Sequence, residues 1–554
     1  MLVPRLRLGI WIGAVWLLAW CATPLAAEST PSLLSESSEG FLRRLPPVQD
    51  WQGDARQASV ASAMQGQPIP TWAPEVEAAP LLNQDDTAAQ LAHYQESAAD
   101  EATPEGTRPI PGRTDTVTKK MDEFPNFKIT GFLQLDGGWY WQSPNNKATV
   151  GDAQDGVGFR RARLAAYGKA AENTNWQLEM DFATAGRPSF FDTFLEQMEV
   201  PAFGNVRIGQ FVQPFSIDSL SGFRNLPFLE RSLPFLAFVP FRRVGLMAYD
   251  LTQDEMTNWG VSVFKTGAFN NAPLGDDRFA TDIGDIGGYS MSTRVTHLMY
   301  YDPLAEDRYL WLIGGGYDFS QLTGNDAAGS GTPGNAGGGP SPFFQTKVLP
   351  EFGMLGYPEN GSSFGSAVNG TPIFVDSGRY AAESFNLWGV ETLWQSGPWS
   401  VQSEWMGMSV NSVVGPIFYN GAYFEVMYRL TGETRVYDKK VAALKNPVPF
   451  TDFISMKPGG VCGWGAWEVA ARWSFVNIHN PEELQGHYYN SATNTYNANG
   501  GVGNGTLNDL TLGVTWFLNA HSKLQFNYIH AMLDNVVRAD STANLFVTRA
   551  QVDW

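Results

Sequence analysis

From Phe127 onward, apolar and polar residues alternate along one stretch of chain after another. In the run FKITGFLQLDGGWYWQ (residues 127–142), alternate positions carry phenylalanine, isoleucine, leucine or tryptophan, and the positions between them are mostly polar. Because successive side chains of a strand point to opposite faces, such a segment has one apolar and one polar face. The same alternation returns in residues 176–182, 423–430, 467–475 and 523–528. The pattern predicts an all-β chain whose strands can cross the hydrocarbon of a membrane when tilted.

These strands are predicted to form a closed transmembrane antiparallel β-barrel. A barrel pairs every backbone N–H and C=O within its own sheet, as the membrane interior requires. Beyond residue 27, the chain has no run of the roughly 18–20 apolar residues that a membrane-spanning helix needs. Its 57 glycines, 13% aromatic residues and only 17% charged residues agree with a barrel, which is rich in turn and interface residues.

The connections between the predicted strands alternate between short polar turns and long segments rich in Gly, Ser and Asn. Outer-membrane barrels have short periplasmic turns and long external loops. The short connections are residues 171–175, 201–205, 397–399 and 519–522, and the long ones are residues 321–378 and 478–508. One connection, residues 431–463, is long where a short turn is due. The count is about 16 strands, an even number, as single-chain bacterial barrels require.

Three regions are predicted along the chain. Residues 1–27 combine two early arginines, an apolar run and small residues, which is typical of a cleaved secretory signal peptide. Residues 28–120 are rich in Pro, Ala, Ser, Gln and acidic residues without periodicity, which predicts a mostly disordered periplasmic extension. Residues 121–554 are predicted to form the barrel, surrounded by outer-membrane lipid. The last strand ends on Trp554, and such an aromatic strand is expected to close the barrel and to be recognised by the barrel-assembly machinery.

Composition and motifs argue against several other classes of function. The net charge of -19 disfavours a nucleic-acid partner, whose phosphates would need a basic surface. Once the signal peptide is removed, Cys462 is the only cysteine, so no intrachain disulfide is expected. The six histidines form no metal-spaced cluster, and the chain has no nucleophile elbow, phosphate-cradling glycine loop or paired-cysteine motif. We therefore expect no enzyme, no catalytic residue, no cofactor and no metal site.

Clustered arginines are the strongest candidates for functional residues. In GFRRARLAAYG, the alternation places Arg161 and Arg163 on the lumen-facing side of a strand. Arg160 has the opposite phase, so it is expected at a strand end or at a bulge. Residues 214–240 are too apolar for an exposed loop and are predicted to fold into the barrel and narrow it, carrying Arg224 with them. Arginine suits such a place because its planar fork of donors meets oxyanions and stays charged. The alternative is that these arginines pair with wall carboxylates and hold the barrel together.

Several motifs together resemble one known family, the phosphate-selective porins O and P of Gram-negative outer membranes. The motifs are FRRARL, VRIGQFVQPF, LERSLPFLAFVPFRRVGL, GPWSVQSEWM, LTGETRVY, GAWEVAARWS and TLGVTWFLN, and the resemblance runs from about Phe127 to Trp554. It implies a 16-stranded barrel, a homotrimer, and binding of oxyanions at a constriction. The positions that match the family's constriction residues are Arg160, Arg161, Asp192 in FFDTF, and Arg294 in STRV.

The chain departs from the phosphate-specific members of that family in the inward segment. It reads IDSLSGF, so Ser219 stands at the lysine position, and Gly222 and Phe223 replace a serine pair. This departure favours a weakly anion-selective or general pore over a phosphate-specific one. Asp192 is expected to orient an arginine, to accept a hydrogen bond from a protonated oxyanion, or simply to pair with an arginine of the wall. The full set of predicted constriction and anion-binding residues is Arg160, Arg161, Arg163, Asp192, Arg224, Arg243 and Arg294.

The preferred function on these grounds is a passive, water-filled channel for small solutes, with a preference for anions such as phosphate or related oxyanions. Two alternatives from other classes stay open. One is a structural anchor that holds the cell wall through residues 28–120. The other is a barrel hydrolase, which would need a Ser or Asp beside a histidine such as His297 or His530 on a neighbouring strand.

Overall fold

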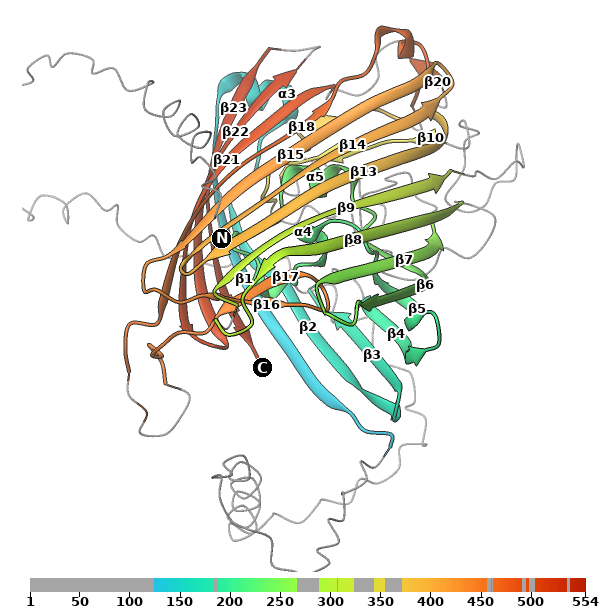
Figure 1. The fold of residues 1–554 in the computed structure, drawn as a ribbon. Helices are drawn as coiled ribbons and strands as arrows, with labels where there is room; N and C mark the ends of the chain where they lie inside the picture. Colours follow the sequence, from blue (N-terminus) through green and yellow to red (C-terminus); the bar gives the residue numbers. More distant parts are fainter. Residues whose placement is uncertain are drawn as a thin grey trace, which may run out of the picture. The chain divides into compact units, whose positions relative to one another are not determined.

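The computed structural model describes residues 124–183, 188–266, 288–305, 307–322, 343–353, 371–455, 460, 462–490, 495–497, 504–535 and 539–554. The predicted signal peptide (1–27) and periplasmic extension (28–120) lie outside these residues. In the described chain, 16 long strands pair antiparallel in chain order, and the last pairs with the first (Figure 1). The predictions of an all-β chain and of about 16 barrel strands are confirmed.

The barrel strands are β1 (Lys128–Gln142), β2 (Gly156–Ala171), β3 (Thr174–Asp181), β4 (Ser189–Val200), β5 (Gly204–Val212), β6 (Arg242–Leu251), β7 (Thr257–Lys265), β8 (Tyr289–Tyr301), β9 (Tyr309–Gln321), β13 (Tyr380–Ser396), β14 (Trp399–Ser412), β15 (Gly415–Arg429), β18 (Ala466–Ile478), β21 (Gly505–Asn519), β22 (Ser522–Asn535) and β23 (Ser541–Asp553). Shorter strands are β10 (Phe343–Phe344), β11 (Lys347–Val348), β12 (Val375–Asp376), β16 (Arg435–Asp438), β17 (Ala443–Pro447), β19 (Tyr488–Asn490) and β20 (Thr495–Asn497). The helical elements are α3 (Pro144–Val150), α4 (Ile217–Leu220), η1 (Phe223–Asn225), α5 (Leu233–Phe238) and η2 (Glu482–Leu484). Among the residues described, no helix has both the length and the apolar character needed to span a membrane.

The barrel wall is apolar outside and polar inside. In β1, Leu133, Leu135 and Trp139 are exposed on the outer face, whereas Gln134 and Asp136 are buried on the inner face. This alternation is the one that the sequence predicts, and it matches a wall with lipid on one side and the lumen on the other.

Residues 213–241, between β5 and β6, form an inward segment that lies inside the barrel; Figure 1 shows its helices α4 and α5 within the ring of strands. The ring of Phe215, in this segment, lies against Gly316 of β9 and Gly389 of β13. These two glycines are directly paired across the strands. A Cβ atom added to either glycine would lie 2.8 or 2.9 Å from the Phe215 ring. Three more lumen-facing glycines, Gly260, Gly421 and Gly513, leave room for Pro214, Pro234 and Phe228 in the same way. Glycine is thus used where the inward segment approaches the wall too closely for any side chain.

Part of the long external connection between β9 and β13 also folds inward. Its rings Phe344, Phe352 and Phe374 join the inward segment in one buried apolar cluster. Glu351 reaches the barrel wall at β18, where it meets Arg472 at 2.7 Å. The lumen is therefore narrowed by two loops.

The exceptional connection, residues 431–463, has two parts. The first is the hairpin of β16 and β17, which turns into the barrel and docks on the wall at β7 and β8. There Arg294 donates hydrogen bonds to the carbonyls of Val441 and Ala442 (3.0 and 3.3 Å), and Asn258 donates to that of Lys440 (2.7 Å). The second part, from residue 448, lies against the outer wall. This connection is long because it carries an inserted hairpin where other strand pairs have only a turn.

Candidate functional site

The tandem arginines of β2 share the lumen because of a β-bulge. Gln134 of β1 pairs with Arg161, but the next residue of β1, Leu135, pairs with Phe159, so Arg160 is the extra residue. A bulge re-aims a side chain that the alternation would otherwise send to the other face. Arg160 and Arg161 therefore both reach the inward segment, as the sequence requires if Arg160 is not to face lipid.

The residue that they reach is Glu230, in the inward segment. Its carboxylate accepts hydrogen bonds from Arg160 Nε (2.9 Å), Arg161 Nη1 and Nη2 (3.0 and 2.9 Å) and Arg549 Nη2 (2.7 Å). Burial alone would raise the pKa of Glu230, but the attraction of the three guanidinium groups outweighs it and holds the pKa well below 4.5. Glu230 thus fixes the inward segment to the wall at β2 and β23.

Most of the other predicted lining residues also form ion pairs. The pairs are Arg163 with Asp181 (2.9 Å), Asp192 with Arg242 (2.9 Å) and Arg294 with Glu391 (2.6 Å). These contacts are those expected if the residues hold the wall together, because a buried guanidinium needs a carboxylate or carbonyl partner. Whether they also contact a passing anion stays a prediction.

Arg224 and Arg243 differ from the rest of the predicted set. Neither has a carboxylate within salt-bridge distance among the described residues. Arg224 donates a hydrogen bond to Thr130 Oγ1 (3.2 Å) and lies over the ring of Phe132, 4.8 Å from its centroid. These two guanidinium groups add positive charge to the lining without the close ion pair that the other predicted arginines form.

Phe223 lies at the centre of the arginine cluster. The guanidinium carbons of Arg161, Arg231 and Arg163 lie 3.8, 3.9 and 4.7 Å from the centroid of its ring, and that of Arg242 lies 5.7 Å away. Cations favour the face of an aromatic ring in this distance range. The ring therefore occupies the point on which these guanidinium groups converge.

The structure brings Arg160, Arg161, Arg163, Asp192 and Arg224 together around the inward segment. It places Arg294 elsewhere, between Glu391 and the β16–β17 hairpin, and Arg243 on β6 opposite Phe211. Sequence reasoning missed the specific partners Glu230, Arg231, Arg242 and Arg549, although the first three occur in the one run LERSLPFLAFVPFRR. Their charges show that these residues are polar, but which of them form ion pairs with one another depends on how the inward segment folds.

Features of an enzyme are not found in the part of the chain that the structure describes. No group of three or more His, Cys, Asp or Glu residues is placed to hold a metal ion there. His297 contacts Thr257 Oγ1 (2.9 Å), and His530 contacts Asn544 Oδ1 (2.7 Å). Both partners are neutral, so neither contact is the acid–base pair that activates a nucleophile.

Comparison with known proteins identifies similar sequences and similar structures. The family model for "Phosphate-selective porin O and P" matches residues 127–292 and 358–554. Porin O of Pseudomonas aeruginosa is 23% identical over 438 residues, which cover 77% of this chain and 88% of the relative. Among solved structures, the anion-selective porin from Comamonas acidovorans has a TM-score of 0.43 at 10% identity and is covered to 99%, over 77% of this chain. The outer membrane channel DcaP of Acinetobacter baumannii has a TM-score of 0.41 at 9% identity, with 97% of it and 77% of this chain covered.

Proposed function

Because this chain belongs to the phosphate-selective porin O and P family, and is therefore a passive channel of the Gram-negative outer membrane, we propose that it favours small anions. As members of a channel family do, it moves solutes down a gradient and carries out no chemical reaction. We assign the anion preference to the lumen arginines, most of which lie between the inward segment and strands β2 to β6. Arg160, Arg161, Arg163, Asp192, Arg224, Arg243 and Arg294 are the proposed lining.

The observation that carries the proposal is the unequal pairing of this lining. Arg160 and Arg161 share the carboxylate of Glu230 and Arg163 pairs with Asp181, whereas Arg224 and Arg243 have no carboxylate at salt-bridge distance among the described residues. In a narrow passage with low-dielectric walls, an uncancelled charge favours ions of opposite sign. Distant surface charge contributes little because salt screens it over about 8–10 Å. The two unpaired arginines can therefore set the preference despite the net charge of -19.

Phosphate specificity is not part of the proposal. Phe223, which fills the convergence point of the arginine cluster, offers no hydrogen bond to an oxyanion. A general preference for anions, with at most weak discrimination among them, fits this arrangement better.

Reversal potentials in planar bilayers under a potassium chloride gradient test the proposal. We expect chloride to permeate better than potassium in the unmodified protein, and the double variant Arg224→Gln, Arg243→Gln to lose most of that preference. Lys147→Gln is the matched control, because Lys147 is half-exposed on α3 and already paired with Asp152 (2.6 Å). A preference for potassium, or a double variant that behaves as the control does, would contradict the proposal.

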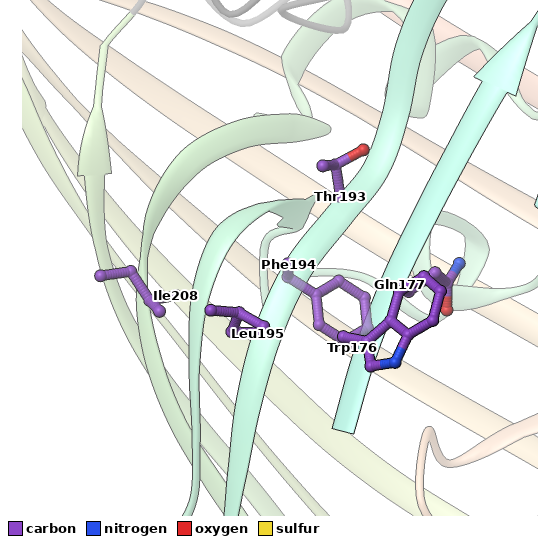
Figure 2. Close-up of a pocket in the computed structure, with 6 residues that line it drawn as sticks. All are labelled: Trp176, Gln177, Thr193, Phe194, Leu195 and Ile208. Carbon is purple, nitrogen blue, oxygen red and sulfur yellow. The ribbon is translucent and has the colours of Figure 1, made fainter. Parts of the chain in front are cut away.

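We also propose that the channel assembles as a homotrimer, through the outer faces of β3, β4 and β5. These strands have 8, 12 and 9 residues, whereas β1 and β2 have 15 and 16, so the wall is low here. Their residues Trp176, Gln177, Thr193, Phe194, Leu195 and Ile208 line a depression of about 400 Å³ (Figure 2). Leu195 and Ile208 are 55% and 60% exposed, so a neighbouring copy could bury apolar surface against them.

The oligomeric state in detergent tests this second proposal. Analytical ultracentrifugation is expected to give a trimer for the unmodified protein and smaller species for Leu195→Asn, Ile208→Asn. Val390→Asn, at an equally exposed outward position of β13, is the control for the loss of an apolar side chain. A trimer that survives the first pair as well as the control would place the interface elsewhere.

A further inference from the structure

The second part of the connection between β15 and β18 lies on the outside of the barrel. Of this part, residues 448–455, 460 and 462–464 are described, and we refer to them as the outer-wall segment. The ring of Phe453 packs on Trp516 of β21, with centroids 4.5 Å apart, and Trp516 stacks on Trp467 of β18 at 4.8 Å. Trp467 and Trp516 alternate with the buried lumen-facing residues of their strands, so both point outward. The outer-wall segment therefore covers the lipid-facing surface and not the lumen.

Hydrogen bonds fix this segment to the wall. The carbonyl of Trp464 accepts from Trp467 Nε1 (3.2 Å) and from Trp516 Nε1 (2.8 Å). The backbone N–H of Phe453 donates to the carbonyl of Leu518 (2.7 Å). An indole N–H near hydrocarbon needs a partner, and at the membrane boundary it usually finds one in water or headgroups. Here the segment supplies that partner itself, as a structure within the boundary region would.

The free side of the outer-wall segment is strongly apolar. Trp464 is 80% exposed and Phe450 68% exposed, and Val448 and Ile454 are exposed beside them. Residues 448–464 contain a single acidic residue, Asp452, and a single basic residue, Lys457. An exposed apolar surface of this kind is unfavourable in water and marks a site with a partner. Because it continues the lipid-facing surface at Trp467 and Trp516, the nearest partner is the same lipid.

We propose that the outer-wall segment lies in the periplasmic leaflet of the outer membrane, where its apolar side chains contact lipid beside β18 and β21. The periplasmic leaflet follows from its position at the short-turn end of the barrel, where Gly397 and Pro398 connect β13 to β14. Aromatic and aliphatic side chains at this depth anchor a protein at the boundary between headgroups and acyl chains. The connection thus serves two environments, with its hairpin in the lumen and its outer part in lipid.

The native cysteine gives a direct test. Cys462 is exposed, stands two residues from Trp464, and is the only cysteine beyond residue 21. A nitroxide spin label on Cys462 of the mature porin, placed in nanodiscs of phosphatidylcholine and phosphatidylglycerol, reports its depth through its accessibility to oxygen and to the water-soluble complex nickel-EDDA. Oxygen concentrates in lipid and the nickel complex in water, so the ratio of the two accessibilities should be several-fold higher at Cys462 than at an aqueous turn.

A label at residue 172 provides that aqueous reference, in the variant Glu172→Cys, Cys462→Ser. Glu172 lies in the short turn between β2 and β3, at the same end of the barrel. If the Cys462 label is as accessible to the nickel complex as the label at residue 172, the segment lies in water and the proposal is overturned. Dipolar broadening between labels, or exclusion of both reagents, would show that a second copy covers the patch and would also overturn it.

A substitution separates lipid contact from mere packing. The double variant Phe450→Asp, Ile454→Asp should make the Cys462 label several-fold more accessible to the nickel complex, because charged side chains are unfavourable on a surface that faces lipid. Val413→Asp, at an exposed apolar position in the turn between β14 and β15 at the opposite end, should leave the label unchanged. The chloride conductance of the unmodified protein and of the two variants reports whether the barrel has folded. An unchanged label in a conducting Phe450→Asp, Ile454→Asp protein would count against the proposal.

Discussion

The contact of Phe215 with two paired glycines provides a direct test of how the inward segment is held in the lumen. Phe215 is fully buried, and its ring rests on Gly316 and Gly389, which face each other across β9 and β13. In Gly389→Ala the new Cβ would lie 2.9 Å from Phe215 Cζ, well inside ordinary van der Waals contact. The strands are fixed by their ladders, so the ring and the inward segment must yield. Overpacking of a filled core costs about 1–3 kcal/mol.

This free-energy cost should weaken the docking of the inward segment and not the folding of the barrel as a whole. An equilibrium between docked and displaced forms would shift by about 5- to 150-fold, at tenfold for each 1.4 kcal/mol. Single-channel recording is the assay, because a displaced segment should add current fluctuations and states of higher conductance. Limited proteolysis near residues 214–240 should become faster in parallel.

Two controls make the result specific. Gly158→Ala, in β2, places a Cβ where no atom lies within 4 Å, so it should record like the unmodified channel. Adding Phe215→Leu to Gly389→Ala should restore the low current noise of the unmodified channel, because the smaller side chain makes room for the added methyl group. A Gly389→Ala channel with unchanged conductance and noise would refute the inference that these glycines seat the inward segment.

Three further predictions concern the lining. Phe223→Ala should raise single-channel conductance, because it removes the ring at which four guanidinium groups converge; an unchanged value would place the ring away from the route of the ions. Asp192→Asn should raise the permeability of chloride relative to potassium, because it removes a negative charge from the lining beside Arg242, and Arg242→Gln should lower it, because it removes a positive charge; reversal potentials that move in the same direction would show that these residues only hold the wall. Because the folded-state pKa of Glu230 is depressed, its ion pairs stabilise the docked segment above the unfolded-state pKa and are lost only as the pH falls through the folded value. Conductance and noise should therefore stay constant from neutral pH down to 4.5, the ordinary value, whereas a transition near 4.5 would contradict the triple contact.

The barrel wall was predictable because period-two alternation is a local signal. In β1 and β23, residues that face outward alternate with residues that face the lumen, so the face of each side chain follows from the sequence itself. The bulge at Arg160 was predictable for the same reason, since a lone arginine in the apolar phase demands an irregularity. The number of strands followed from the alternation of short and long connections.

The interior was less predictable because it depends on contacts between residues far apart in the chain. Nothing near Glu230 in sequence indicates that it meets Arg160, Arg161 and Arg549, which lie 70, 69 and 319 residues away. The lumen-facing glycines did leave a signal: at Gly316 and Gly389, a side chain is missing from the polar phase of a strand. Read as flexible or weak strand positions, such glycines are uninformative; read as places of close approach, they indicate where an inserted segment touches the wall.

The inward segment explains why so many lumen cations are unavailable to a solute. An irregular segment inside a barrel has no strand ladder to take up its carbonyl groups, and an unpaired buried carbonyl is costly. Wall and segment cations take up several of them: Arg231 donates to Asp218 and Ser221, Arg435 to Asn225, Lys523 to Leu226, Arg549 to Leu229 and Arg472 to Glu230. Each of these donors is held by the backbone that it satisfies, whatever ion passes. A lumen arginine therefore becomes a candidate for solute contact only when it is free of both carboxylates and inserted carbonyls, a criterion that singles out Arg224 and Arg243 within the proposed lining.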